Sequence, residues 1–379
     1  MKLRVGHSIS SLFLTTNWIY TQLVTMQKYE PITVARRIRS DGFVLDHLYS
    51  IDKFKNPEKF FLRVLRKTKI FEYEYYILKK SNISLLHSHF GYIGFSDLKI
   101  AQKLKIPHIT TFYGCDISMP QREPAWGKKY HQLFAECELF LTEGNYMKKC
   151  LIDLGCGKEK IIVQHIGVDL EKIPYVSRKI GSDGKIKILA SGTFTEKKGL
   201  PYAIEAFAHV KEKYKDIEFI LIGGVPNETY LPHIKIRDAI FNVIDKYKLR
   251  DSVKILGYLP YDEYLKVSQQ AHIFISPSVH AENGDTEGGA PVSIIEMSAS
   301  GMPIISTFHC DIPEVVINGE TGYLAPERDV DALVDKLDYL ISHPEQWQDM
   351  GQKGRQHIQK EYDLIKQVEK LENLYSRLL

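Results

Sequence analysis

Short β-rich runs alternate with helical patterns along most of the chain, and this alternation constrains the fold more than any other feature. The first half contains "LRVGHSI", "ITVARRI", "LLHSHF", "HITTFYG", "LFLTEG" and "IIVQHIG", and the second half contains "IKILASG", "FILIGG", "VKILGYL", "IFISPS" and "PIISTF". Strands separated by helices predict parallel sheets that are covered on both faces. A polar, turn-rich segment at 167–185 separates the two series. We therefore predict two doubly wound, Rossmann-like α/β domains that face each other across a cleft.

The domain boundaries follow from the same pattern. We predict a first domain over residues 1–170 and a second over 171–355. From about Glu345 to Leu379 the pattern predicts two helices, without strand signals between them. A terminal helix over 356–379 could pack back on the first domain.

Composition excludes several classes of protein. The chain has 379 residues, 44% apolar and 26% charged, with a formal charge of +3, which is typical of a globular protein and too small to indicate nucleic-acid binding. No apolar run approaches the roughly 20 residues of a membrane span. Polar residues interrupt the N-terminal apolar stretch, which favours a first strand over a cleaved signal peptide. The five cysteines form no C-x-x-C pair, so we expect no disulfide framework, no zinc site and a reduced, cytoplasmic compartment.

Two glutamates stand at the ends of a glycine-proline loop and an apolar helical stretch, "AENGDTEGGAPVSIIEMSASGMPIIST". Pro291 suits the start of a helix and Gly301 its end. Glu296 then lies on a mostly buried helix, and Glu287 lies in the loop before it. A carboxylate among apolar residues needs a partner, which the local pattern does not identify.

A basic loop, "ASGTFTEKKGLPYAIEAF", precedes another predicted helix. A strand ends at Gly192, and Gly199 with Pro201 opens the helix. Backbone N–H groups at a helix start attract anions, so Lys198 is well placed for a diphosphate. The alternative is that Lys197 and Lys198 are solvated surface lysines.

In the first half, "HSHFG" and "TFYGCD" both follow strand-like runs, and polar groups at such strand ends point into the binding crevice. His87 and His89 alternate with Ser88, so both are expected on one side of a strand. No third ligand accompanies them at a suggestive spacing, and we therefore expect no metal site.

The stretch from Phe54 to Lys80 mixes aromatic and basic residues. We interpret it as a helix that covers the first sheet. The alternative is a helix that lies on an anionic membrane surface. Its candidate contacts are Arg63, Arg66, Lys67, Lys69, Lys79 and Lys80.

Several motifs occur in the order found in one family. The stretches are "GTFTEKKG", "SPSVHAENGDTEGGAPVSIIEM", "GMPIISTFHCDIPEV" and "NGETGYLAP". On these residues the chain resembles the family 4 retaining glycosyltransferases, which have the GT-B fold. The resemblance implies transfer of a sugar from a nucleoside-diphosphate sugar to an acceptor hydroxyl, in polysaccharide or glycolipid biosynthesis, with neither cofactor nor metal.

The resemblance also implies functions for individual residues. Glu296 corresponds to the glutamate that binds the nucleotide ribose, Glu287 to the one that binds the donor sugar, and Lys198 to the diphosphate-binding lysine. The expected catalytic residues are Lys198, Glu287, Tyr113 and Asp116, with His87 and His89 on the acceptor side. The remaining expected donor-binding residues are Gly192, Thr193, Gly288, Gly289, Ala290, Pro291 and Val292.

Three positions depart from the family pattern. Eight residues separate Glu287 from Glu296, where seven are usual; Thr193 replaces an arginine; and Tyr113 replaces a histidine. The last two changes support an alternative, a catalytically silent sugar-nucleotide-binding subunit. A sugar-nucleotide epimerase of the same fold is a further alternative. The expected partners are a nucleotide sugar and a glycan or lipid-linked acceptor, but no nucleic acid. The basic stretch is compatible with peripheral association with the cytoplasmic face of an anionic membrane.

Overall fold

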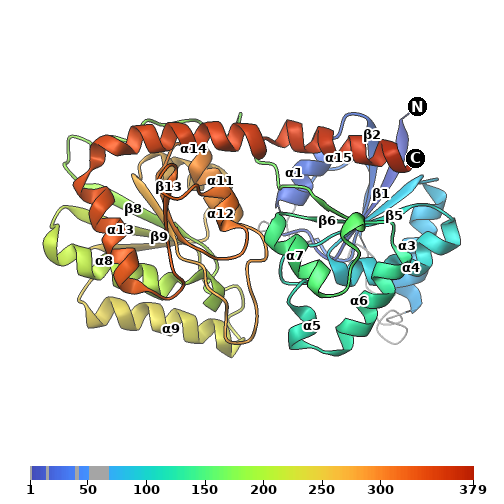
Figure 1. Ribbon diagram of the computed structural model, residues 1–379, viewed down its shortest axis with the longest axis horizontal. Helices are drawn as coiled ribbons and strands as arrows, with labels where there is room; N and C mark the ends of the chain where they lie inside the picture. The colour runs from blue at the N-terminus through green and yellow to red at the C-terminus, as the bar shows by residue number, and fades with distance from the viewer. Residues whose placement is uncertain (1, 14–16, 39–41, 51–67) are drawn as a thin grey trace. The chain divides into compact units, whose positions relative to one another are not determined.

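The computed structural model describes residues 2–13, 17–38, 42–50 and 68–379 (Figure 1). The chain divides into two compact units. The first unit consists of the chain up to Gly167 together with Leu364–Leu379. The second unit consists of Val168–Asp363. The division thus lies three residues before the expected boundary after residue 170.

The end of the chain forms two helices, as expected from residue 345 onward, but the terminal segment begins at Leu364 rather than at residue 356. Helix α14 (Trp347–Glu361) belongs to the second unit, and α15 (Leu364–Leu378) belongs to the first. Ile358 and Tyr362 pack in the core of the second unit, whereas Leu364 packs in the core of the first. The chain therefore changes units at the break between the two helices.

Among the described residues, the first unit contains a parallel sheet of seven strands in the order β3-β2-β1-β4-β5-β6-β7. The strands are β1 (Leu3–Ile9), β2 (Tyr29–Ala35), β3 (Leu48–Ser50), β4 (Leu85–His89), β5 (His108–Thr111), β6 (Leu139–Thr142) and β7 (Ile161–Val163). The helices around it are α1 (Asn17–Thr25), α3 (Thr68–Lys80), α4 (Gly91–Leu104), α5 (Met119–Arg122), α6 (Ala125–Glu136), α7 (Asn145–Asp153) and α15.

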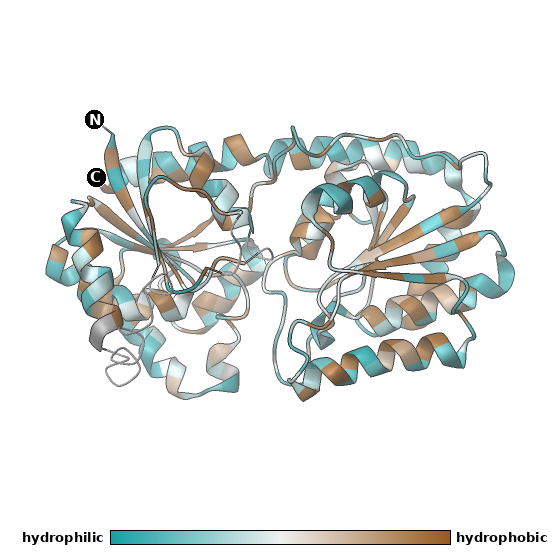
Figure 2. Cartoon of the chain, turned by 180° about the vertical axis from the view of Figure 1, so that it is seen from behind, coloured by the Kyte–Doolittle hydropathy of each residue, from teal (hydrophilic) through white to brown (hydrophobic). Residues whose placement is uncertain are grey.

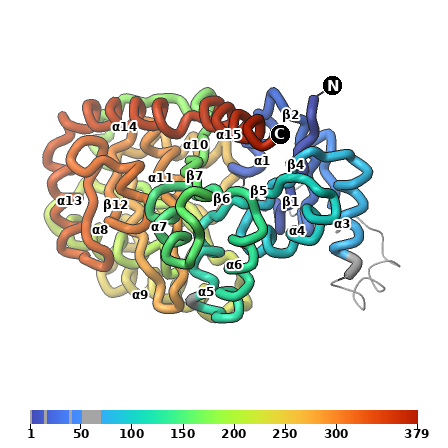
Figure 3. The backbone as a smooth tube through the Cα atoms, turned by 45° about the vertical axis from the view of Figure 1, so that its right-hand side comes forward, coloured from blue at the N-terminus to red at the C-terminus, as the bar shows by residue number. Residues whose placement is uncertain are grey.

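Helices cover this sheet on both faces, so its central strands are buried on both sides. Every residue of β4 is buried, as is typical of a central strand in a parallel sheet. Helix α15 lies beside α1, and residues of both pack in one core cluster with Val5 and Ile9 of β1 (Figure 3). Helix α3 contributes Ile77 and Leu78 to another cluster with β2 and β4, as expected of a sheet-covering helix; the part of the predicted helix over 54–67 lies outside the described residues.

The second unit, within the described chain, contains a parallel sheet of six strands in the order β10-β9-β8-β11-β12-β13. The strands are β8 (Ile186–Ser191), β9 (Ile217–Ile222), β10 (Val253–Gly257), β11 (Ile273–Ser276), β12 (Ile304–Thr307) and β13 (Gly322–Ala325). The helices are η4 (Glu196–Lys198), α8 (Leu200–Lys213), α9 (Leu231–Lys246), α10 (Tyr261–Gln269), α11 (Val292–Ala299), α12 (Ile312–Val315), α13 (Val330–Ser342) and α14.

Alternating side chains of the second sheet enter two core clusters. Ile188 and Ala190 of β8 belong to one cluster, and Leu189 between them belongs to the other. The hydropathy colouring shows the apolar strands between more polar helices (Figure 2). Strands β3 and β13 were not among the expected runs. They are short edge strands, LYS and GYLA, and unlike the equally short β7 (IIV) they contain none of the β-branched residues that mark a strand.

Candidate functional site

The chain between β8 and α8 brings Lys198 to the carboxyl end of the second sheet. Lys198 is the last residue of the short helix η4, and Gly199 follows with a φ of +61°. A Cβ atom on Gly199 would lie 1.9 Å from the carbonyl oxygen of Pro277, so only glycine fits there. Helix α8 then starts at Leu200 with Pro201 in its first turn, as predicted. The lysine is thereby held directly before a helix N-terminus.

Lys198 and Glu287 form an ion pair. The Lys198 Nζ atom lies 2.9 Å from Oε1 and 3.0 Å from Oε2 of Glu287, and Ser278 donates its hydroxyl to Oε1 at 3.2 Å. The two side chains are only 17% and 7% exposed. Burial alone would raise the pKa of Glu287, but the charges of Lys198 and Lys197 hold it below its ordinary value. Glu287 is therefore ionised, and its charge is balanced by the lysine.

Lys197 is also bound rather than solvated. Its Nζ atom donates to the Thr286 carbonyl at 2.9 Å and lies 3.3 Å from the Asp285 carboxylate. The interpretation of Lys197 and Lys198 as solvated surface lysines is therefore wrong. Both amines hold the loop that carries Glu287.

Glu296 lies on α11, which begins at Val292 after Pro291 and ends before Gly301 as predicted. The hydroxyl of Tyr261 at the start of α10 donates to Glu296 Oε1 at 2.9 Å. Burial raises the pKa of Glu296 to about 7. Tyr261 was not among the predicted site residues, because it lies 35 positions from Glu296 in the sequence.

The other expected donor-binding residues are backbone positions around these carboxylates. Gly192 directly follows β8, and a Cβ atom on Gly223 after β9 would lie 1.9 Å from the Gly192 carbonyl oxygen. The Thr193 and Thr195 hydroxyl oxygens are 3.4 Å apart. Residues Gly288, Gly289, Ala290 and Pro291 are buried between Glu287 and α11, and Val292 is partly exposed at the helix start.

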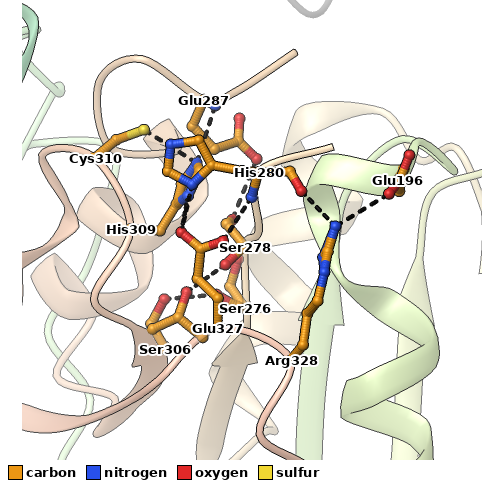
Figure 4. Close-up of polar contacts among 11 residues, drawn as sticks. Glu196, Ser276, Ser278, His280, Glu287, Ser306, His309, Cys310, Glu327 and Arg328 are labelled. Carbon is orange, nitrogen blue, oxygen red and sulfur yellow. Dashed lines mark hydrogen bonds and ion pairs between the residues drawn. The ribbon is translucent and has the colours of Figure 1, made fainter. Parts of the chain in front are cut away.

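A second set of polar residues, absent from the sequence predictions, lies behind Glu287 (Figure 4). Its members are His309 and Cys310 after β12, Glu327 after β13, and His280 in the loop after β11. Glu327 Oε1 lies 2.7 Å from Nδ1 of both histidines. The backbone N–H of Glu287 donates to His309 Nε2 at 3.2 Å. The available signal was the position of "FHCDIP" directly after a predicted strand.

In the first unit, His89 and Tyr113 belong to a buried hydrogen-bonded chain. The Tyr113 hydroxyl lies 2.7 Å from His89 Nδ1, and His89 Nε2 lies 3.1 Å from Nδ1 of His7 on β1. Sequence spacing suggested no third ligand, but β1 pairs with β4 and brings His7 opposite His87. Burial lowers the pKa of His89 to about 3 and the pKa values of His7 and His87 well below their ordinary value. All three rings are neutral.

His7, His87 and His89 form a buried cluster in which one nitrogen of each ring lies within 4.8 Å of the others. The rings of His87 and His89 stack with centroids 4.4 Å apart. His87 is bound at both nitrogens, to the Tyr375 hydroxyl and the Thr111 hydroxyl at 2.7 Å each. His87 and His89 are also buried, whereas Tyr113 is partly exposed. We had expected His87 and His89 to contact the acceptor directly, and their burial does not fit that expectation. Tyr113 is the more accessible side chain.

Backbone N–H groups form hydrogen bonds to the side chain of Asp116. Its carboxylate accepts from the Gly91 N–H at 2.8 Å and the Tyr113 N–H at 3.0 Å. Burial raises its pKa to about 6. The geometry therefore favours a positioning function for Asp116 over the expected catalytic one: it ties the Tyr113 loop to the start of α4.

Comparisons with known proteins match both units. A family model described as glycosyl transferases group 1 matches residues 175–357, and one described as glycosyltransferase family 4 matches residues 36–172. The amylovoran biosynthesis glycosyltransferase AmsK of Erwinia amylovora is 36% identical over 247 residues, which are 65% of this chain and 58% of AmsK. The putative colanic acid biosynthesis glycosyltransferase WcaL of Escherichia coli is 33% identical over 253 residues, 66% of this chain and 59% of WcaL. The chain thus spans less than two thirds of these relatives.

Solved structures share the fold at low identity. Sucrose-phosphate synthase from Thermosynechococcus elongatus has a TM-score of 0.81 and 16% identity, over 100% of this chain and 99% of that one. Anabaena Alr3699/HepE, in complex with UDP and glucose, has a TM-score of 0.78 and 13% identity, over 99% of this chain and 100% of that one. Within the described residues, no helix combines the length and apolarity needed to cross a bilayer.

Proposed function

The chain belongs to the group 1 glycosyltransferases and has the GT-B fold, and we propose that it transfers a sugar from a nucleoside-diphosphate sugar to an acceptor hydroxyl, with retention at the anomeric carbon. The observation that carries the proposal is the buried Lys198–Glu287 ion pair before the N-terminus of α8. A cation at a helix start suits a diphosphate, and a carboxylate beside it suits sugar hydroxyls.

The ion pair explains how one site could hold both parts of the donor. When a diphosphate approaches, its charge competes with Glu287 for the Lys198 amine. Glu287 then has lone pairs to accept hydrogen bonds from the donor sugar, while Glu296 accepts from the ribose. Lys198 and the α8 N-terminus stabilise the charge that grows on the leaving diphosphate. These groups supply the positive charge themselves, and we therefore propose a reaction without a metal or cofactor.

Tyr113 is the proposed acceptor-side residue. Its hydroxyl is tied to His89 and its backbone to Asp116, so both its position and its hydrogen bonding are fixed. Burial raises its pKa well above the ordinary value, so it acts as a neutral hydrogen-bonding group rather than as a base. Two of the relatives are named for amylovoran and colanic acid biosynthesis, which supports a glycan or lipid-linked acceptor in polysaccharide or glycolipid assembly.

A donor screen tests the proposal. UDP-, GDP- and ADP-sugars are added separately and the melting temperature is measured, since a ligand of the folded state raises it. The stabilising donor, labelled in the sugar, is then incubated with the protein and candidate acceptors, with and without a chelator. Transfer that persists with the chelator is expected. Isomerisation alone would indicate the epimerase, and binding without turnover would indicate the catalytically silent subunit suggested by Thr193 and Tyr113.

We also propose peripheral attachment to the cytoplasmic face of an anionic membrane through the basic end of α3. Lys79 and Lys80 are exposed there, next to Tyr76. The other candidate contacts, Arg63, Arg66, Lys67 and the side chain of Lys69, lie outside the described residues. Each basic residue near such a surface contributes up to about 1 kcal/mol. Sedimentation with anionic liposomes at low salt, lost at high salt, is the expected result, and a protein that stays in the supernatant under both conditions contradicts it.

A further inference from the structure

The loop that carries Glu287 is anchored from the opposite side by His309, which the proposed transfer reaction has not used. His309 follows β12, and its side chain is fully buried. It contacts Glu287 through the main chain: the Glu287 N–H donates to His309 Nε2 at 3.2 Å. On its other side, His309 Nδ1 lies 2.7 Å from Glu327 Oε1 (Figure 4). The imidazole therefore connects the Glu327 carboxylate with the Glu287 backbone.

The proton positions on His309 follow from its partners. A backbone N–H can only donate, so Nε2 carries no proton and Nδ1 carries it; the Cys310 thiol, 3.1 Å from Nε2, is then a second donor to that nitrogen. An ionised Glu327 accepts that proton's hydrogen bond. Burial opposes the charge of Glu327, but hydrogen bonds from His280 and His309 keep its pKa below the ordinary value. Burial also lowers the pKa of His309, so the ring remains neutral and in this tautomer.

Glu327 is itself held in place. Its Oε2 accepts the backbone N–H of His280 at 2.7 Å, and its Oε1 also contacts His280 Nδ1 at 2.7 Å. The next residue, Arg328, lies 3.2 Å from Glu196 in η4 and donates to the His280 carbonyl. Glu196 also accepts the Glu282 N–H at 3.0 Å. Both ends of the loop from His280 to Glu287 are thus tied to neighbouring loops.

We propose that His309, oriented by Glu327, is a positioning residue that fixes the backbone at Glu287 so that its carboxylate faces Lys198 and the donor sugar. This inference rests on the proposed function of Glu287. The geometry favours positioning over a metal site at His280, His309 and Cys310, although ligand atoms of these residues lie within 4.8 Å of one another. Both nitrogens of His309 already have partners, and burial raises the pKa of the Cys310 thiol, which keeps its proton.

Two substitutions of His309 separate positioning from a general packing effect. In His309→Gln, the side-chain oxygen can accept from the Glu287 N–H and the amide nitrogen can donate to Glu327. His309→Leu removes both contacts. We expect kcat at saturating donor to fall about tenfold to a hundredfold in His309→Leu, the range that misplacing a reacting group commonly produces. In His309→Gln most of that loss should be absent. The Kd of the free nucleoside diphosphate should change less than about twofold in either variant, since the sugar contact is what moves.

Hydrogen exchange at the Glu287 amide provides a readout that does not depend on the reaction. We expect exchange about threefold to tenfold faster in His309→Leu than in the wild type or His309→Gln, as the loss of one hydrogen bond implies. The matched control is His280→Leu, which removes the other imidazole on Glu327 but leaves the Glu287 contact. Its Glu287 amide should exchange at the wild-type rate.

The outcomes separate the two proposals. A wild-type protein that binds no nucleotide sugar contradicts the proposed function, while the amide measurement still tests the positioning of the Glu287 loop. Unchanged exchange in His309→Leu, or equal kcat losses in the glutamine and leucine variants, overturns the positioning inference. If His309→Leu does not fold, ¹⁵N NMR of the wild type decides: a proton on Nε2 of His309 would exclude the acceptor that the inference requires.

Discussion

At the scale of single residues, the site is built from charges that neutralise each other before any ligand binds. Lys198 and Glu287 are the clearest case, since both are largely buried and each is the counter-ion of the other. Removing one partner leaves an uncompensated charge in a poorly solvated place. A loss of activity in a single variant therefore mixes loss of the ligand contact with damage to the site, and stability must be measured beside it.

We predict that Lys198→Ala lowers the free energy of unfolding by about 3 kcal/mol, because Glu287 loses its counter-ion. The double variant Lys198→Met with Glu287→Gln should recover most of that loss, since no buried charge remains unpaired. Urea unfolding of the single and double variants measures the coupling. Lys254→Ala is the control: this lysine is 58% exposed in its pair with Glu218, and its loss should cost less than about 1 kcal/mol. A double variant no more stable than Lys198→Ala would contradict the interpretation.

Glu296 gives the second residue-scale prediction, a pH dependence of donor binding. Its folded pKa is about 7, raised from 4.5 by burial. Below pH 7 the carboxyl is mostly protonated, so binding that requires the carboxylate weakens as pH falls through 7 and reaches a plateau above about 8. One pH unit below the pKa, the affinity should be about tenfold lower.

The measurement is the Kd of a nucleotide sugar between pH 5.5 and 8.5. A nucleotide sugar is chosen because its diphosphate has no terminal phosphate that titrates in this range. Glu296→Gln should bind more weakly and show a nearly flat profile. An equally steep profile in that variant would assign the titration to another group.

At the scale of secondary-structure elements, α15 is part of the core of the first unit although it comes last in the chain. Its apolar side chains join the core that contains β1 and α1, and its Tyr375 hydroxyl binds His87 on β4. Glu372 accepts hydrogen bonds from the backbone N–H groups of Gln27 and Lys28, directly before β2. The helix therefore completes the core of the first unit and satisfies polar groups at its centre.

We predict that Leu371→Ala destabilises the first unit by about 2–5 kcal/mol, the usual range for truncating a buried leucine. Leu371 is almost fully buried, whereas Ile365 on the same helix is 65% exposed. Ile365→Ala is therefore the matched control, and it should change the stability by less than about 0.5 kcal/mol. Thermal unfolding of both variants checks the prediction. Similar small shifts in the two would mean that α15 is not part of the core.

At the scale of the whole molecule, the two units have separate cores, and the proposed donor site belongs to only one of them. Each unit has its own sheet and its own clusters of buried residues. The proposed donor residues Lys198, Glu287 and Glu296 all lie in the second unit. A nucleotide sugar should therefore stabilise that unit more than the other.

We predict that a bound nucleotide sugar raises the melting temperature of the second unit by several degrees and that of the first by much less. Tryptophan fluorescence can separate the units, because Trp18 and Trp126 lie in the first and Trp347 lies in the second. In the variant Trp18→Phe with Trp126→Phe, Trp347 reports the second unit alone, and Trp347→Phe is the converse control. Equal shifts in the two variants would indicate that the units unfold together.

Local sequence patterns predicted most of the strands and helices and their order, although they missed the short edge strands β3 and β13. The alternation of apolar runs and helical patterns predicted two parallel α/β units, and local turn chemistry predicted the start of α8 at Gly199 and Pro201. Pro291 and Gly301 likewise gave the limits of α11. These features depend on neighbours within a few residues, so they can be read from local pattern and backbone preference.

Which side chains meet depended instead on the three-dimensional fold. Glu287 meets Lys198 across 89 residues, Glu296 meets Tyr261 across 35, and His309 meets the Glu287 backbone across 22. The fold also places a third histidine, His7, beside His89. It buries the rings of His87 and His89, which had been expected to face the acceptor. In a parallel sheet, strands distant in sequence end side by side, so the partners at that edge depend on strand order. No local periodicity encodes that order, and the partner of each buried charge therefore followed from the fold alone.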